Sequence, residues 1–207
     1  MSKVPVCYTI GPIDSAKNPE LAFSYVEKQV TSIGHKVINP VKNESQKTGL
    51  EVKESLDHLH NLWRTGRVEE FVDIMKKIWK ADLKAVHEAD YLVLHFEEGD
   101  TGGGTFLEMT MASMQALLGL LASVAEPEDK AFIKASKVVL KEAGIVRKPV
   151  YWVCQGASSD INTTLKFLVY ISGGAIFKTY KELVEYLVEH YGKFKVIEEE
   201  IKDEKTE

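Results

Sequence analysis

A single carboxylate, Glu108, lies in a segment that is otherwise uncharged and closely follows three glycines, Gly102, Gly103 and Gly104. Glycines let a ligand approach the backbone closely, and the N-terminus of a following helix stabilises an ionised carboxylate. A Glu kept ionised in a sheltered pocket is suited to act as a nucleophile at a sugar anomeric carbon. The segment Thr105-x-x-Glu108 also matches a capping box, in which the Glu side chain accepts a hydrogen bond from the N-cap N–H. The sequence leaves both interpretations open.

Asp82 and Tyr8 are the other two candidate catalytic residues. Asp82 falls on the apolar stripe of a predicted helix, beside Trp79. A carboxylate on a buried face is costly unless it is paired or hydrogen-bonded, so Asp82 is either a structural partner or a functional acid. Tyr8 begins the segment Tyr8-Thr9-Ile10-Gly11-Pro12, which closes the first apolar run. A tyrosine at a strand end is more often part of the core, but near a carboxylate its hydroxyl could donate a hydrogen bond and fix that carboxylate.

Most of these positions follow predicted strands, at the carboxyl edge where open α/β sheets bind ligands. Loop aspartates are usually turn formers, although Asp100 could also bind a sugar hydroxyl or a base edge. The candidate substrate contacts are Gly11, Pro12, Asp14, Trp79, Asp100, Gly102, Gly104 and Thr105. The glycine segment is neither a phosphate-binding Walker A loop nor a dinucleotide GxGxxG element, which disfavours nucleoside triphosphate hydrolysis and nicotinamide redox chemistry.

Short runs rich in β-formers alternate with amphipathic stretches along the chain, and this pattern predicts the elements that position these residues. Strands are expected at residues 4–10, 35–39, 91–96, 149–154 and 175–177, and helices at 19–33, 52–63, 67–88, 106–125, 132–140, 160–171 and 183–191. The βαβ beginning implies a parallel sheet. We therefore predict an α/β fold: a five-stranded parallel sheet flanked by helices, in a flavodoxin- or Rossmann-like three-layer sandwich.

Composition fits one domain over residues 1–192, with a helical insertion at about 42–78 and a charged tail at 193–207. The chain has 207 residues, 44% of them hydrophobic, and a net charge of −5. It shows no basic patch, so we expect no nucleic-acid polymer as a partner. The two cysteines, Cys7 and Cys154, form no CxxC motif and are expected to be buried thiols. The histidines show no ligand spacing, so neither a metal nor another cofactor is predicted.

The segment from Phe106 to Ala125 is apolar enough to resemble a membrane span, but it contains Glu108 and Gln115 and lacks flanking anchors. A helix that is apolar nearly all round is more often buried in a core or in a subunit interface. We therefore expect no membrane partner and a homo-oligomer. The first residues contain no apolar run typical of a signal peptide, and a cytoplasmic location is the expectation.

Four short motifs together resemble the nucleoside 2-deoxyribosyltransferase family. Tyr8-Thr9-Ile10-Gly11-Pro12 is similar to the opening Tyr-x-x-Gly-Pro of that family, and Ala81-Asp82 with Ala89-Asp90-Tyr91-Leu92-Val93 is similar to its "Asp…Ala-Asp" segment. Gly104-Thr105-Phe106-Leu107-Glu108 resembles its Gly-Thr-x-x-Glu element, and Lys148-Pro149-Val150 resembles its Lys-Pro-Val. Order and spacing agree over roughly residues 4 to 190.

The resemblance implies cleavage of a nucleoside N-glycosidic bond by an oligomeric enzyme with active sites close to subunit interfaces. It implies that Glu108 attacks the anomeric carbon, that Tyr8 orients it, that Asp82 helps to protonate the departing base, and that Asp100 is a possible sugar or base contact. The chain departs from the family in longer segments at about 42–78 and 126–143. Its loop after the first strand has no arginine, which argues against a 5′-monophosphate substrate.

Several functions remain open at this point. Transfer of the deoxyribosyl group from a nucleoside or nucleotide to another free base gives a transferase, and transfer to water gives a (deoxy)nucleotide N-glycoside hydrolase. A non-catalytic nucleotide-binding module, with Glu108 as a helix cap, is the alternative from a different class. A glycohydrolase acting on a dinucleotide such as NAD is a further alternative.

Overall fold

The predicted α/β architecture is confirmed in the computed structural model, which describes residues 3–13, 18–42, 52–96, 103–143, 145–154 and 163–194. Its sheet is parallel throughout, in the order β2-β1-β3-β4-β5. The strands are β1 (Val6–Ile10), β2 (Lys36–Ile38), β3 (Tyr91–Leu94), β4 (Val150–Val153) and β5 (Ile176–Phe177). This strand order is that of flavodoxin-like doubly wound folds.

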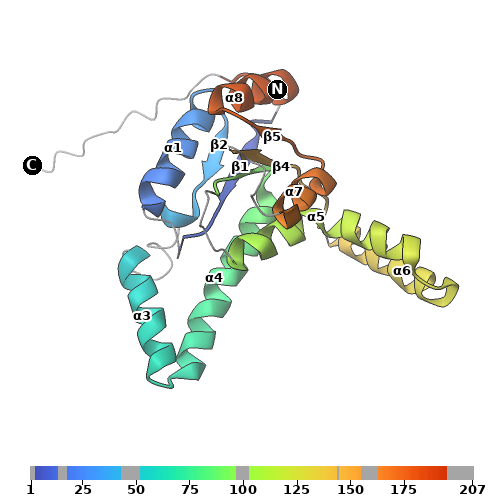
Figure 1. Ribbon diagram of the computed structural model, residues 1–207, viewed down its shortest axis with the longest axis horizontal. Helices are drawn as coiled ribbons and strands as arrows, with labels where there is room; N and C mark the ends of the chain where they lie inside the picture. Colours follow the sequence, from blue (N-terminus) through green and yellow to red (C-terminus); the bar gives the residue numbers. More distant parts are fainter. Residues whose placement is uncertain are drawn as a thin grey trace, which may run out of the picture.

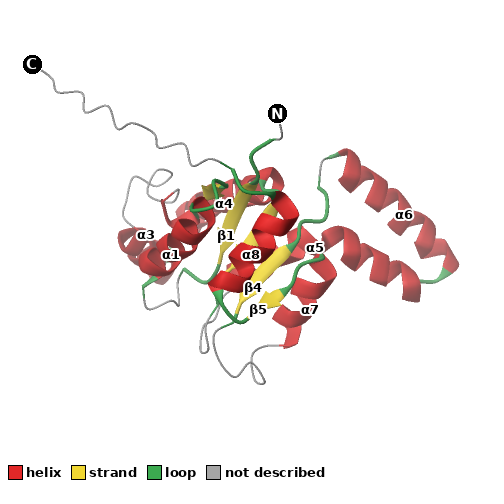
Figure 2. Cartoon of the chain, turned by 90° about the horizontal axis from the view of Figure 1, so that it is seen from above, coloured by secondary structure: helices red, strands yellow, loops and turns green. Residues whose placement is uncertain are grey.

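Helices cover both faces of the sheet (Figures 1 and 2). They are α1 (Pro19–Thr31), α3 (Val52–Arg64), α4 (Val68–Glu88), α5 (Gly103–Val124), α6 (Pro127–Glu142), α7 (Thr163–Ser172) and α8 (Tyr180–Tyr191). Side chains alternate between the two faces along each strand. Tyr8 and Ile10 of β1 therefore pack with α4, α5 and α7, whereas Cys7 packs with α1 and α8. The three-layer sandwich gives two cores that share one sheet.

Local sequence explains where several helices begin and end. Asn18 caps α1, since its side chain accepts a hydrogen bond from Leu21 N at 3.0 Å, with Pro19 at the first helical position. Gly66, at φ +73°, separates α3 from α4, because a left-handed backbone conformation at this point suits only glycine. Gly34, at φ +79°, closes the turn after α1 and packs against the Phe194 carbonyl.

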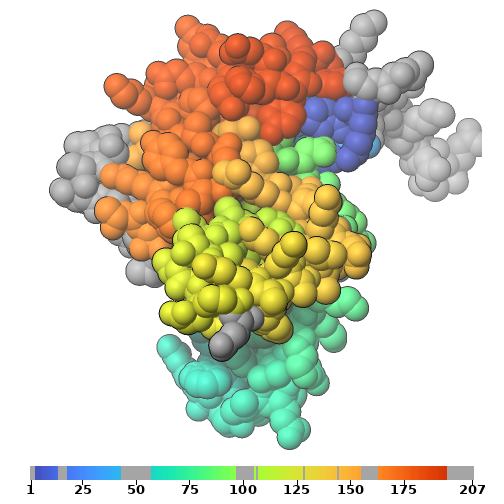
Figure 3. All heavy atoms as spheres, turned by 90° about the vertical axis from the view of Figure 1, so that its right-hand side faces the viewer, coloured from blue at the N-terminus to red at the C-terminus, as the bar shows by residue number. Residues whose placement is uncertain are grey.

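Two helical arms project from the sandwich (Figure 1). One is the antiparallel pair of α3 with the first half of α4, which falls largely within the insertion predicted at about 42–78. The other is the second half of α5 paired with α6. Figure 3 looks onto the end of this second arm, which stands in front of the sheet between α7 and the first arm. Neither arm packs against the sheet along its whole length, because both extend past the edges of the sheet.

The helix with membrane-span composition is only partly buried. In the described part of the chain one window, Leu107–Val124, is long and apolar enough to cross a membrane, and 22% of it is buried. Its beginning packs in the core through Met109 and Ala112, which are fully buried. The rest lies on the projecting arm. Of the two settings expected for this helix, a core or a subunit interface, the core accounts only for the first half of α5, because the second half extends beyond the sheet.

Candidate functional site

Tyr8 and Glu108 meet in the interior of the protein, as their sequence positions suggested. The Tyr8 hydroxyl donates a hydrogen bond to Glu108 Oε1 at 2.6 Å, across 100 residues of sequence. Tyr8 is fully buried, and Glu108 is 7% exposed. A distance this short is typical of an O–H group bonded to an ionised carboxylate. The pair therefore holds one carboxylate oxygen in a fixed place within a water-poor environment.

Asp82 belongs to the same group of side chains. The pKa of Tyr8 is raised well above its ordinary value, first by burial and then by the negative charges of Glu108 and Asp82, both of which also hydrogen-bond to it. A phenol held between two carboxylates keeps its proton at neutral pH and acts as a donor. Asp82 comes from α4, Tyr8 from β1 and Glu108 from the first turns of α5. Three elements thus bring together the three residues predicted to be catalytic.

The capping-box interpretation of Thr105 and Glu108 is wrong for this structure. Helix α5 begins at Gly103, two residues before Thr105, so Thr105 lies inside the helix and is not its N-cap. Its Oγ1 is buried and has no hydrogen-bond partner within the described residues, although in a capping box that oxygen accepts a hydrogen bond from the Glu108 N–H. An unpaired buried hydroxyl costs roughly 1–3 kcal/mol. Such groups in native proteins call for an explanation, and a functional role is one of them.

The three residues lie near the topological switch point of the sheet. β1 lies between β2 and β3, so the chain moves first from β1 outward to β2 and later to β3 on the other side of β1. Ligands of open α/β sheets bind in the crevice outside the carboxyl ends of such neighbouring strands. There, His95 N bonds to Ile10 O at 2.9 Å and continues the ladder between β1 and β3. The first turns of α5, which carry Thr105 and Glu108, follow the loop that leaves β3.

Gly11 and Pro12 close β1 at this edge, but Gly11 has a packing role of its own. A Cβ atom on Gly11 would collide with the His95 carbonyl and press against the Phe23 ring. Glycine is therefore required for the close approach of the β1 and β3 ends. Pro12 is buried beside it. Both residues shape the edge of the sheet, and neither needs to touch a substrate to account for its presence.

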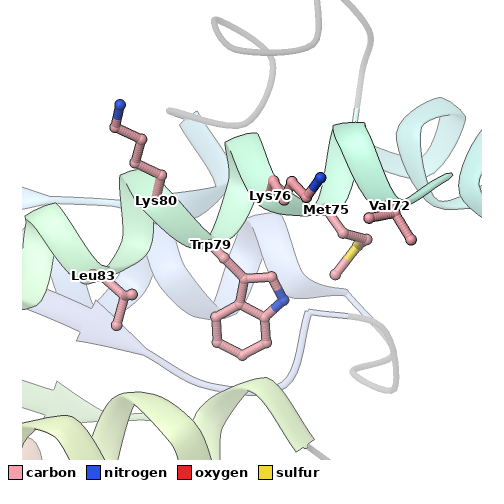
Figure 4. Close-up of a pocket in the computed structure, with 6 residues that line it drawn as sticks. All are labelled: Val72, Met75, Lys76, Trp79, Lys80 and Leu83. Carbon is pink, nitrogen blue, oxygen red and sulfur yellow. The ribbon is translucent and has the colours of Figure 1, made fainter. Parts of the chain in front are cut away.

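Trp79 lies on the predicted apolar stripe of α4, with Val72, Met75 and Leu83. It lines an open groove of about 520 Å³ together with Val72, Met75, Lys76, Lys80 and Leu83. Figure 4 shows the Trp79 ring beside the Leu83 and Met75 side chains, with the Lys80 ammonium turned away. Asp82 belongs to the next turn of the same helix. The groove and the Tyr8–Glu108–Asp82 site are therefore both built in part by α4. All the described residues that line the groove come from this one helix.

Three predicted contacts, Asp14, Asp100 and Gly102, lie outside the described residues, and Gly104 falls in the first turn of α5. Among the described residues no group of three or more potential metal ligands occurs. Cys7 and Cys154 are free and buried, as expected. Burial raises the pKa of the Cys7 thiol, which makes it a poor nucleophile.

His95 is the residue that the sequence reasoning passed over, since histidines were considered only as metal ligands. It follows β3 at the carboxyl edge, and its Nδ1 lies 3.3 Å from the Tyr180 hydroxyl. Its ring packs obliquely against Phe23 on the α1 side of the sheet. Its position directly after β3, at the edge where ligands of such sheets bind, could have singled it out from the sequence. Its ring lies on the face opposite Glu108, however, and serves to fix the strand end.

Comparisons of this chain with protein-family models, with curated proteins and with solved structures found no match. A functional conclusion therefore depends on the geometry of the site and on the chemistry of its side chains.

Proposed function

We propose that this protein cleaves the N-glycosidic bond of (deoxy)nucleosides through a covalent intermediate on Glu108, and transfers the deoxyribosyl group to another base. The observation that carries the proposal is the buried 2.6 Å hydrogen bond from Tyr8 to Glu108 near the switch point of the sheet. A nucleophilic carboxylate must be ionised, oriented and shielded from water. A neutral tyrosine donor on a buried carboxylate supports all three requirements.

The reaction has two steps, like that of retaining glycosidases. In the first, a Glu108 oxygen forms a bond to the anomeric carbon while the bond from that carbon to the base nitrogen breaks. The electron pair leaves with the base, which takes up a proton with the help of Asp82. In the second, a nitrogen of an acceptor base attacks the same carbon, the bond from that carbon to the Glu108 oxygen breaks to release the carboxylate, and the proton of the acceptor nitrogen passes to Asp82. Tyr8 donates to Glu108 throughout and limits its motion.

The first turn of α5 supports binding of the substrate. The helix N-terminus presents backbone N–H groups near the site, and the unpartnered Thr105 hydroxyl offers a donor and an acceptor. The segment that follows β1, residues 11–17, contains no arginine, and this favours nucleosides over their 5′-monophosphates. If water replaces the acceptor base in the second step, the same site gives a hydrolase.

The experiment is product chromatography after incubation with each deoxynucleoside and deoxynucleoside monophosphate, with and without a second free base. The proposal predicts a new nucleoside only when the acceptor is present, and no reaction with Glu108→Gln. Glu189→Gln, the same substitution at an exposed position of α8, is the matched control and should react normally. Free base released without an acceptor would identify the hydrolase. No turnover of any substrate would favour the non-catalytic binding module.

A further inference from the structure

The projecting arm formed by residues 117–142 carries more apolar surface than its own two helices use. On α5, Leu117, Leu120, Leu121 and Val124 follow the i, i+3, i+4, i+7 spacing of a helical stripe. Leu120 is 47% exposed, Leu121 52% and Val124 79%. A stripe of this length on a soluble helix normally faces a partner element. Nothing among the described residues covers it.

Helix α6 repeats this pattern. It packs on α5 through Ile133, which is buried, and the arm is anchored where Gln115 Nε2 donates to the Ile145 carbonyl at 3.0 Å. A second stripe lies on another side of the helix and is exposed along its whole length. It comprises Ala131, Phe132, Ala135, Val138 and Val139. Two helices that pack against each other and each leave an apolar stripe exposed can form one half of a four-helix bundle.

The charge along α6 indicates what completes the bundle. Residues 126–130, at the tip of the arm, contain three acidic residues and one lysine, a net charge of −2. Residues 134–142, toward its base, contain three lysines and one glutamate, a net charge of +2. Two copies of the arm packed antiparallel would place each acidic tip against the basic region of the other. A two-fold axis makes one surface complementary to itself in this way.

A membrane fits the arm less well than a second copy does. The beginning of α5 is held in the core by Thr105, Met109 and Ala112, so the helix cannot cross a bilayer without disrupting that core. Helices that lie on membrane surfaces are rich in lysine and arginine on the polar face, whereas the charges of residues 126–142 cancel.

We propose that two copies of this chain associate through the arm of residues 117–142, packed antiparallel as a four-helix bundle. Light scattering coupled to size exclusion, over a dilution series of the full chain, should then give twice the 23.2 kDa chain mass. Leu121→Glu and Phe132→Glu should each give the single-chain mass, because each places a charge in the apolar interface between the two copies. Leu21→Glu, at a residue 68% exposed on α1, is the matched control and should stay dimeric.

Charge reversal tests the antiparallel arrangement. Asp129→Lys and Lys141→Glu should each weaken the dimer by roughly tenfold, and the double variant should regain most of that affinity. Circular dichroism of all variants separates these effects from loss of helix. A wild-type chain that is monomeric at every concentration would overturn the proposal. A dimer that survives Leu121→Glu and Phe132→Glu, or reversals that do not compensate, would overturn it equally. None of these measurements depends on turnover, so the outcome is independent of the role of Glu108.

Discussion

Replacing Tyr8 by Phe removes one hydroxyl from the centre of the proposed site and leaves the aromatic ring in the core. The lost interaction is a buried hydrogen bond of 2.6 Å to a carboxylate, and a second carboxylate, Asp82, also hydrogen-bonds to the hydroxyl. A hydrogen bond to a charged group contributes about 1.5–3 kcal/mol, and the buried carboxylate that loses its donor adds a desolvation cost. We expect Tyr8→Phe to lower the free energy of unfolding by about 2–3 kcal/mol.

Urea denaturation followed by circular dichroism measures this loss, and Tyr151→Phe provides the matched control. The Tyr151 hydroxyl lies 3.1 Å from the Tyr191 hydroxyl, so its hydrogen bond joins two neutral groups. Such a bond contributes only about 0.5–1.5 kcal/mol. The same chemical change should therefore cost distinctly less at Tyr151 than at Tyr8.

A double-mutant cycle of Tyr8→Phe with Glu108→Gln isolates the pair itself. The reasoning requires a coupling free energy above about 1 kcal/mol between the two positions. It would be refuted by additive effects, or by a Tyr8→Phe protein as stable as the wild type. The same variant should also turn over substrate more slowly, since its nucleophile is no longer oriented.

Three further predictions concern single residues. Thr105→Val removes an unpaired buried hydroxyl, so it should raise the melting temperature and weaken substrate binding. Thr105→Ser keeps the hydroxyl and should change neither. A lower melting temperature for the Val variant would show that the hydroxyl has a hydrogen-bond partner. His35 donates from Nε2 to the Gly192 carbonyl and accepts at Nδ1 from the Tyr91 hydroxyl, and burial lowers its pKa below the usual 6.5. As the pH falls, the unfolded chain therefore takes up this proton before the folded chain does. The contribution of His35 to the free energy of unfolding should be complete above pH 6.5 and should decrease as the pH falls toward the lowered pKa, by at most about 1.4 kcal/mol per pH unit. His35→Gln should remove this part of the pH dependence in urea denaturation. Gly34→Ala should destabilise the fold by at least about 1 kcal/mol, because the φ of Gly34 is positive and the Phe194 carbonyl occupies the space that a Cβ would need. An unchanged midpoint of urea denaturation would contradict this.

The sheet was predictable because its strands are short, continuous runs of β-formers bounded by Gly, Pro or a helix start. The βαβ order of residues 4–39 fixes parallel pairing, and parallel pairing places the ends of β1 and β3 at one edge. That argument placed the segments of Tyr8 and Glu108 near one edge of the sheet, and the family resemblance implied the contact between the two side chains, which are 100 residues apart.

The beginning of α5 was placed too late from sequence. Glycine has low helix propensity, so a start at Thr105 or Phe106 was the natural expectation from Gly102–Gly104. The helix begins at Gly103 instead, and Thr105, Glu108 and Met109 are all buried. Tertiary packing of these three side chains outweighs the local preference. The difference matters, because it turns Thr105 from a cap into an unpaired hydroxyl within the site.

The exposed half of α5 could not have been predicted from hydropathy. The apolar pattern continues to Val124, but how much of a helix the sheet covers depends on the width of that sheet and on where α7 packs. Sequence alone therefore identifies a helix with apolar residues on several faces. It does not show which of these faces are covered by other elements of the same chain.

The most direct test of the central claim is to capture the glycosyl group on the protein. The chain would be incubated with a deoxynucleoside, quenched in acid, digested and examined by mass spectrometry, with Glu108→Gln treated in parallel. The account predicts a peptide containing Glu108 that carries one deoxyribosyl group, and no such peptide from the variant. Release of free base by the wild type without any adduct, or an adduct on another residue, would contradict it.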